Sequence, residues 1–252
     1  MSGLVRDAHA VAEHRVGNDA TSVREVIDAA DGCEPFTLRV LRAVTGRSME
    51  RTTDGAEELL FVVAGNGQLL LGDREHHALE PEMGVLLRPG ERYELHNDDP
   101  ADLVVVSVSL HEPLPATGRV VSRLADAVAQ SATAAREFRI VFDADHGCPT
   151  ATQFVGYIPV GAAPLHYHLY EEVIYVLDGN GVMHMNDTQT PLRAGSCIHL
   201  PPRKLHILEN SGPGVMRVLG IFRPAGSPAA AFYPDGTPAY TAGESQTVST
   251  SN

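Results

Sequence analysis

The sequence has few cysteines, no long apolar run and too few basic residues to balance its acidic ones. Its three cysteines, Cys33, Cys148 and Cys197, are odd in number and form no Cys-x-x-Cys pair, which predicts reduced thiols in a cytoplasmic protein and no disulfide framework. No run approaches the roughly 18–20 apolar residues that a membrane-spanning helix needs. The N-terminal residues carry scattered charges without an apolar core, so we expect no secretory signal.

The charge balance excludes further classes of protein. The 252 residues include 19 basic and 32 acidic side chains, a formal net charge of −13. An acidic surface repels phosphate backbones and anionic lipids, so we expect no nucleic-acid partner and no membrane partner. The apolar fraction of 43% and the charged fraction of 20% are ordinary for a globular protein, and the length suits one large domain or two smaller ones.

An internal repeat decides between one domain and two. The segment EELLFVVAGNGQLLLGD at 57–73 aligns without a gap with EEVIYVLDGNGVMHMND at 171–187, an offset of 171 − 57 = 114 residues. Solenoid units are shorter, at roughly 20–50 residues, so this offset indicates a duplicated domain.

Both copies read as short strands. Runs rich in β-branched and aromatic residues alternate with turn signals, and the two Gly-Asn-Gly segments suit tight hairpins. This pattern predicts an all-β fold of antiparallel sandwiches or barrels. The Ala-rich stretch Ser122–Ala135 favours a helix, although a loop fits it equally.

These features predict five regions along the chain. They are an N-terminal segment (1–22), a first β-domain (23–112), a linker that is helical or irregular (113–138), a second β-domain (139–240) and a polar, disordered tail (241–252).

Residues with metal-binding chemistry gather in the second copy. His166 and His168 are two apart on an expected strand, so their imidazoles project from one face. Glu172 follows near the start of the next strand, and His206 lies on another. Three imidazoles and a carboxylate suit a divalent transition metal and leave coordination positions open for substrate.

The second copy resembles a cupin, and the whole chain resembles a bicupin. The first cupin motif, G-x5-H-x-H-x3,4-E-x6-G, is matched from His166 to Gly179, with Gly161 one residue too close. The second motif, G-x5-P-x-G-x2-H-x3-N, is matched from Gly195 to Asn210, except that Arg203 replaces its third conserved position, a glycine. The resemblance implies two tandem double-stranded β-helix (jelly-roll) barrels, paired as an internal pseudo-dimer; a homodimer of the chain is also possible.

The resemblance also implies one metal ion in the second barrel. The cupin ligand positions fall on His166, His168, Glu172 and His206, and the metal is Fe, Mn, Ni, Cu or Zn, with its identity left open. In the first copy the same positions hold Thr52, Asp54, Glu58 and Tyr93, which are poor ligands, so we expect that this metal site is lost.

Other residues are expected near the metal. Strand parity places Ile174 and Val176 on the face of Glu172, where they line the substrate site, and turns Tyr175 the other way. Arg203 precedes His206 and is a candidate contact for an anionic substrate at the rim. Glu172 is the expected catalytic residue, because a carboxylate ligand can also transfer a proton.

Cupins with this ligand set include dioxygenases, so the resemblance favours a dioxygenase that acts on a small oxygen-bearing organic molecule. The same ligands also occur in non-redox isomerases, decarboxylases, lyases and cyclases, and the sequence does not separate these reactions. A non-catalytic bicupin that binds a small molecule is the remaining alternative.

Overall fold

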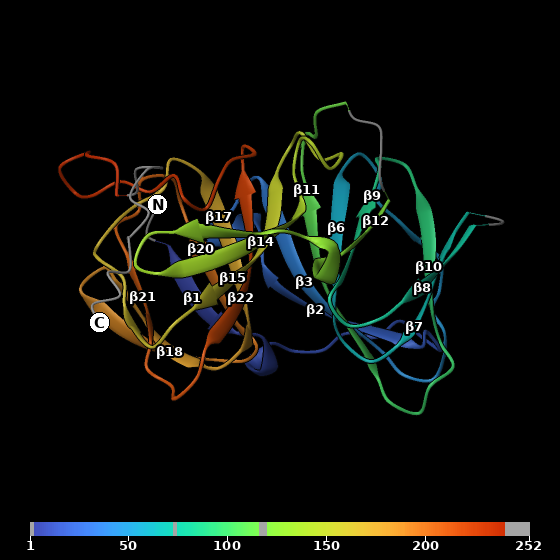
Figure 1. Cartoon of the computed structure of the whole chain (residues 1–252). Helices are drawn as coiled ribbons and strands as arrows, with labels where there is room; N and C mark the ends of the chain where they lie inside the picture. Colours follow the sequence, from blue (N-terminus) through green and yellow to red (C-terminus); the bar gives the residue numbers. More distant parts are fainter. Residues whose placement is uncertain (1–2, 73–74, 116–119, 240–252) are drawn as a thin grey trace, which may run out of the picture.

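The computed structural model describes residues 3–72, 75–115 and 120–239 and contains two β-barrels side by side (Figure 1). Each barrel has a large and a small sheet, and every pairing between described strands is antiparallel. The only helices among these residues are the short 3-10 helices η1 (Ala8–Ala10), η2 (Ala29–Asp31) and η3 (Leu124–Asp126).

The N-terminal barrel has a six-stranded and a five-stranded sheet. In pairing order the large sheet contains β12 (Val121–Arg123), β9 (Met83–Leu87), β6 (Glu57–Ala64), β11 (Leu103–Leu110), β3 (Phe36–Ala43) and β2 (Thr21–Ile27). The small sheet contains β4 (Gly46–Arg47), β10 (Arg92–Asn97), β7 (Gly67–Leu71) and β8 (Glu75–Leu79), with β5 (Arg51–Thr52) also paired with β10.

The C-terminal barrel has a seven-stranded and a four-stranded sheet. In pairing order the large sheet contains β1 (Leu4–Asp7), β20 (Ser196–Leu200), β17 (Glu171–Asp178), β22 (Met216–Arg223), β15 (Thr152–Ile158), β14 (Arg136–Phe142) and β13 (Ala129–Ala132). The small sheet contains β16 (Gly161–Ala162), β21 (Ile207–Asn210), β18 (Asn180–Met185) and β19 (Thr188–Arg193).

The helix over Ser122–Ala135 was predicted wrongly. Residues Val121–Arg123 form β12 on the edge of the N-terminal barrel, and Ala129–Ala132 form β13 on the edge of the C-terminal barrel, with η3 between them. Alanine favours helix locally, but here the segment gains backbone hydrogen bonds to β9 and β14 and buries Leu124. The expected linker is therefore built into both barrels.

The chain ends of the barrels also differ from the expected regions. The segment 1–22 contributes β1 to the C-terminal barrel, where Leu4 pairs with His199, so the N-terminal end of the chain crosses to the far domain. Strand β2 begins at Thr21, and the C-terminal barrel begins with β13 at Ala129. The predicted tail at 241–252 lies outside the described residues.

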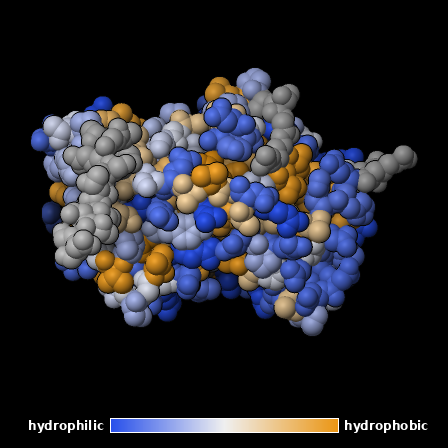
Figure 2. Space-filling model, viewed as in Figure 1, coloured by the Kyte–Doolittle hydropathy of each residue, from blue (hydrophilic) through white to orange (hydrophobic). Residues whose placement is uncertain are grey.

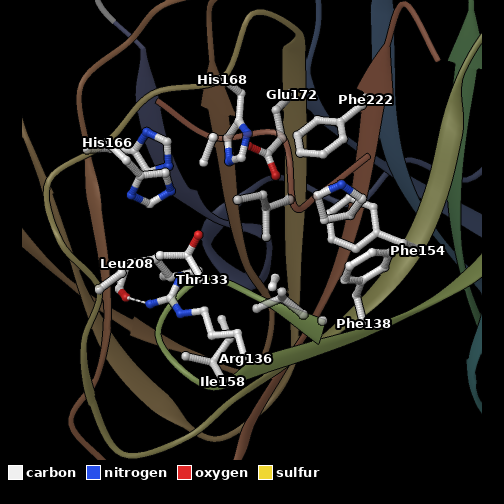
Figure 3. Close-up of a pocket in the computed structure, with 18 of the residues that line it drawn as sticks. Thr133, Arg136, Phe138, Phe154, Ile158, His166, His168, Glu172, Leu208 and Phe222 are labelled. Atoms are coloured by element: carbon white, nitrogen blue, oxygen red, sulfur yellow. Dashed lines mark hydrogen bonds between the residues drawn. The ribbon is translucent and has the colours of Figure 1, made fainter. Parts of the chain in front are cut away.

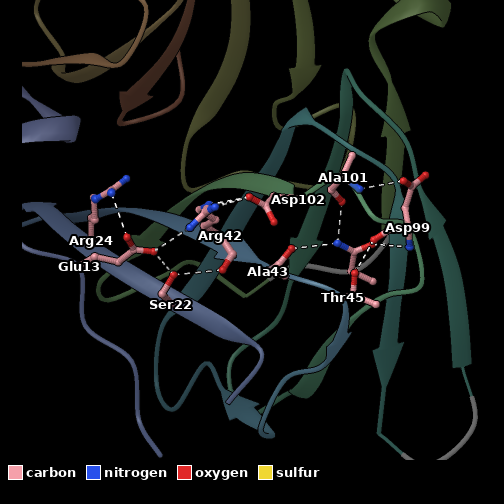
Figure 4. Close-up of polar contacts among 10 residues, drawn as sticks. Glu13, Ser22, Arg24, Arg42, Ala43, Thr45, Asp99, Ala101 and Asp102 are labelled. Carbon is pink, nitrogen blue, oxygen red and sulfur yellow. Dashed lines mark hydrogen bonds and ion pairs between the residues drawn. The ribbon is translucent and has the colours of Figure 1, made fainter. Parts of the chain in front are cut away.

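Equivalent asparagines hold the same turn in both barrels. The side-chain amide of Asn97 donates to the carbonyls of Ala43 and Ala101, at 3.0 and 2.9 Å (Figure 4). The amide of Asn210 donates to the carbonyls of Ile158 and Gly214, at 2.8 and 2.7 Å. Both asparagines are buried, and the shared bonding pattern carries the sequence repeat into the structure.

Among the described residues the buried apolar side chains form three large cores and a small cluster of Phe138, Phe154 and Phe222. One fills each barrel, and the largest lies between the two large sheets, where Phe36, Leu38 and Phe61 pack with Tyr175 and Ile221. Tyr175 thus faces the other barrel while Ile174 faces its own, as strand parity predicts. The two barrels therefore share one buried interface.

The outer surface is mainly polar on the face shown in Figure 2, with smaller separate hydrophobic patches. Part of this polarity is organised into ion pairs beside the N-terminal barrel, where Arg42 contacts Asp102 and Glu13, and Glu13 also pairs with Arg24 (Figure 4). All three cysteines are buried and free. Among the described residues there is no helix of the length and hydrophobicity that crossing a bilayer requires.

Candidate metal centre

Three histidines meet at one end of the C-terminal barrel. His166 and His206 form an isolated antiparallel bridge, with N-to-O distances of 3.2 and 3.0 Å between their backbones. His206 immediately precedes β21, and His168 lies two residues beyond His166, so its side chain projects from the same face. The backbone bridge fixes the separation of two imidazoles before any metal is considered.

The imidazole nitrogens are arranged as metal ligands. Ligand atoms of His166, His168 and His206 all lie within 4.8 Å of one another, and all three residues are buried. Each Nδ1 contacts a backbone carbonyl: that of Pro164 at 2.8 Å, of Ala230 at 3.1 Å and of Lys204 at 2.8 Å. A carbonyl only accepts, so each Nδ1 carries the proton and each Nε2 keeps its lone pair for a metal.

The charge state of the site suits a cation. Burial lowers the pKa of His168 to about 3 and also lowers the pKa of His166 and His206, so the three imidazoles are neutral. Burial raises the pKa of the Glu172 carboxyl to about 8 from an ordinary value of 4.5, and the charge of Arg136 opposes this shift. A bound cation would stabilise the Glu172 carboxylate and use the free imidazole lone pairs.

Glu172 lines the same cavity as the three histidines. It lies near the start of β17, where it pairs with Leu200 on one side and with Phe222 on the other. In Figure 3 its carboxyl group points toward His168. The histidines alone form the compact group of nitrogens, and Glu172 borders it.

The cavity beside these residues is small and mostly apolar. Its volume is about 80 Å³, below the roughly 300 Å³ at which sites for drug-sized ligands begin. Phe138, Phe154 and Phe222 line the side away from His166 (Figure 3), and Ile158 and Leu208 contribute to the wall. This space suits a small substrate.

Sequence reasoning placed one of the three expected substrate-binding residues in the cavity. Ile174 lines it. Val176, two residues further along β17, is fully buried in the barrel core and is not among the lining residues. Arg203 is exposed outside the cavity with a φ of +63°, which explains why the cupin motif has glycine at this position. The rim contact predicted for Arg203 stays a prediction.

The arginine of the cavity is instead Arg136, which sequence reasoning missed. It begins β14, its guanidinium donates to the carbonyl of Leu208, and it lies across the cavity from Glu172 (Figure 3). Burial lowers its pKa to about 10, a sign of how far it is removed from water. Arg136 and Phe138 are two apart on one strand, which predicts that their side chains share a face. The sequence interpretation assigns this stretch to the linker and therefore misses that signal.

Other residue types occupy the ligand positions of the N-terminal barrel. Thr52, Asp54, Glu58 and Tyr93 line a cavity at the corresponding place, and none of them is an imidazole. The Tyr93 hydroxyl donates to Glu58 at 3.0 Å, so two former ligand positions bond to each other.

A second group of metal-ligating residue types lies near the interface between the barrels. Ligand atoms of Cys33, Glu171 and His199 fall within 4.8 Å of one another, all buried. His199 Nε2 and Glu171 Oε1 are 2.6 Å apart, so this pair is already joined by a hydrogen bond. We read it as a polar contact of the fold.

Two family models match the chain, one in each barrel. The model of the cupin domain matches residues 153–222, and that of the AraC-like ligand binding domain matches residues 38–125. Each barrel thus matches one of these models, and the sequence repeat relates the two barrels to each other. The chain is a bicupin of the cupin superfamily.

Solved structures show the same fold for the bicupin. The putative glyoxylate-induced protein of Pseudomonas aeruginosa matches with a TM-score of 0.72 and 20% identity, over 87% of this chain and 88% of that one. Oxalate decarboxylase of Bacillus subtilis matches with a TM-score of 0.72 and 13% identity, over 90% and 78%. At these identities the likeness concerns the fold alone.

Sequence relatives match a shorter stretch. An uncharacterised protein of Methanocaldococcus jannaschii is 33% identical over 64 residues, which is 25% of this chain. The match spans 51% of that relative, about half its length.

Proposed function

We propose that the bicupin is a metal-dependent enzyme that acts on a small organic acid in its C-terminal barrel. The observation that carries the proposal is the position of Arg136, a partly buried guanidinium across a small cavity from three neutral imidazoles and Glu172. Removing a charge from water is costly unless it is paired, and among the described residues the guanidinium donates to a backbone carbonyl and forms no ion pair. A substrate carboxylate would supply the missing counter-charge.

The metal would be held by His166, His168 and His206 through Nε2, with Glu172 as the fourth ligand. A divalent transition metal (Fe, Mn, Ni, Cu or Zn) fits neutral imidazoles and one carboxylate. When bound, it would polarise an oxygen of the substrate as a Lewis acid.

The residues around the metal site would orient the substrate and exclude water. Arg136 binds the carboxylate, because a guanidinium matches two carboxylate oxygens at once. The rings of Phe138, Phe154 and Phe222 contact the carbon skeleton. Glu172, which is buried, would accept a proton at a carboxylate oxygen and return it within the cavity.

Dioxygenation is the reaction class we propose first. The apolar wall of the cavity suits dioxygen, an apolar co-substrate. The non-redox candidate is a decarboxylase, isomerase, lyase or cyclase. A decarboxylase is favoured among these by Arg136, since it holds the acid group.

The first experiment is the metal content of protein purified without chelating resin, measured by mass spectrometry beside His166→Ala. We expect about one transition metal per chain, lost in the variant. The metal-loaded protein is then given a panel of small carboxylic acids while dioxygen consumption and carbon dioxide release are followed. Dioxygen uptake supports the first class, and turnover without uptake supports the second.

Two results would contradict the proposal. A protein that takes up no metal even after reconstitution is not this enzyme. Tight binding of acids by the metal-loaded protein, without turnover of any of them, favours a non-catalytic binding bicupin.

A further inference from the structure

The N-terminal barrel contains a larger cavity than the metal centre does. Its volume is about 440 Å³, against about 80 Å³ in the C-terminal barrel. The cavity lies at the corresponding end of the barrel, because Thr52, Asp54, Glu58 and Tyr93 line it at the positions of the metal ligands. This barrel has lost its metal-binding residues and kept a space of ligand size.

The aromatic wall of the metal centre is replaced here by polar side chains. Ser109 is the partner of Glu58 on the neighbouring strand, and Phe222 is the equivalent partner of Glu172. Ser109 therefore takes the place of Phe222. Arg39 lies four residues before Ala43 on β3, as Phe154 lies four before Ile158 on β15. Ala43 and Ile158 are the equivalent carbonyls bound by Asn97 and Asn210. Two phenylalanines are thus exchanged for an arginine and a serine.

Two guanidiniums line this cavity with donors to spare. Arg39 donates from Nε to Glu25 at 2.8 Å and from Nη1 to Ser109 at 2.9 Å. Arg51 donates from Nη2 to Asp19 at 3.1 Å. Nη2 of Arg39 and Nη1 of Arg51 donate no hydrogen bond to an acceptor among the described residues. Burial raises the pKa of Tyr93, and the positive charges of Arg51 and Arg39 both oppose this rise. The Tyr93 hydroxyl is therefore within electrostatic reach of both guanidiniums.

Acceptors line the same cavity as these donors. Oε1 of Glu58 takes hydrogen bonds from Tyr93 and Ser107, which compensates its charge inside the barrel. Asp54 and Glu112 are exposed at the rim, where their carboxylates are able to accept from hydroxyl groups of a ligand. The cavity therefore offers cationic donors in its wall and anionic acceptors at its mouth.

We propose that the N-terminal barrel binds a small hydroxy acid in this cavity without a metal. Arg39 and Arg51 would bind its carboxylate through their free nitrogens, since guanidinium–carboxylate contacts are short and charge-assisted. Its hydroxyl groups would donate to the rim carboxylates. An acid without hydroxyls would leave the rim unused, and a neutral polyol would leave both guanidiniums unpaired.

The test uses the full chain carrying Arg136→Gln, so that the partly buried cation of the other barrel does not compete. L-tartrate, a hydroxy acid with two carboxylates, is titrated into this protein and followed by calorimetry. We expect binding at one site per chain. Arg39→Gln should weaken it at least about tenfold, the scale of one charge-assisted hydrogen bond.

Matched controls separate the cavity from general charge. Arg203→Gln removes an exposed arginine outside both cavities and should leave tartrate binding unchanged. Ser109→Phe restores the aromatic side chain of the other barrel and should block the cavity. If thermal unfolding shows that Arg39→Gln is not folded, Arg51→Gln, on a different strand, replaces it with the same expected loss of affinity.

Three outcomes would overturn the proposal. The first is no tartrate binding at millimolar concentration. The second is binding of threitol, the neutral tetrol of the same carbon skeleton, as tight as that of tartrate. The third is tartrate binding that both arginine variants leave unchanged.

Discussion

His166 and His206 exchange both of their backbone hydrogen bonds, at 3.2 and 3.0 Å, although 40 residues separate them in the sequence (206 − 166). This bridge joins the segment that carries two metal-ligand candidates to the start of β21, which carries the third. Because the Nδ1 atoms are also bonded to carbonyls, the imidazoles are oriented by the fold itself. We therefore expect a metal site that is formed before the metal arrives.

The stability of the metal-free protein should depend on pH through Glu172. Its folded pKa of about 8 lies above the ordinary 4.5, so between these values the folded state binds more protons than the unfolded state. Stability conferred by Glu172 is lost as pH rises toward 8. The three imidazoles have pKa values below their ordinary 6.5, so they affect stability only below pH 6.5, where stability falls as pH falls.

The window between pH 6.5 and 8 therefore isolates Glu172 from the three histidines. Thermal unfolding of the metal-free protein should give a falling Tm across this window. Glu172→Gln, which does not titrate, should give a flat one. A Tm that falls equally in both proteins would show that another group is responsible.

Metal binding should release a proton below pH 8. Glu172 must lose its proton to become a ligand, so apparent metal affinity should rise with pH up to about 8 and then level off. Calorimetric titration in buffers of different ionisation enthalpy counts the protons released. The count should be close to one per metal at neutral pH and should vanish in Glu172→Gln.

Arg136→Gln should impair catalysis without removing the metal. The substitution takes away the charge that we assign to the substrate carboxylate, and a charge-assisted hydrogen bond is worth about 1.5–3 kcal/mol. We expect kcat/KM to fall by roughly tenfold to a hundredfold, mainly through KM, while metal content stays at the unmutated level. Arg15→Gln, at an exposed position that does not line the cavity, is the matched control and should behave like the unmutated protein. Unchanged kinetics in Arg136→Gln would remove the organic acid from the proposal.

How far the sequence alone predicts this site depends on how local the signal is. His166, His168 and His206 follow from motif spacing, because each side chain lies next to the turn that the motif encodes. Arg136 enters the cavity from a strand outside both motifs, whereas Arg203 is predicted because it is near His206 in sequence. Arg203 has a positive φ, is exposed and does not line the cavity, and no spacing rule shows this.

The fold shows the same division. The parity of β17 correctly separates Ile174 from Tyr175, since alternation is a local property of a strand. The Ala-rich stretch was misread because its strands are stabilised by partners far away, β9 at Met83–Leu87 and β14 at Arg136–Phe142. Helix propensity is a weak prior when long-range pairing is available.

Loss of the equivalent asparagines should destabilise both barrels but affect the metal in only one. Asn97→Ala and Asn210→Ala each leave two carbonyls without their donor, and the buried one, of Ala43 or of Ile158, costs about 1–3 kcal/mol when unsatisfied. Asn210 ends β21, the strand that follows His206. Urea unfolding should show a loss of stability in both variants, and only Asn210→Ala should lower metal affinity. Equal metal affinity in the two variants would show that the position of His206 does not depend on this turn.

Phe61→Ala should destabilise the whole chain, because its ring is fully buried in the core shared by the two large sheets. Truncation of a buried phenylalanine leaves a cavity and costs about 3–5 kcal/mol. Since the same core contains Tyr175 and Ile221 of the C-terminal barrel, we expect one cooperative transition in which metal release coincides with loss of the circular dichroism signal. Val16→Ala, at an exposed position, is the control and should shift the midpoint little. Two separate transitions in Phe61→Ala, with the metal held through the first, would mean that the barrels fold independently and that their interface contributes little to the metal site.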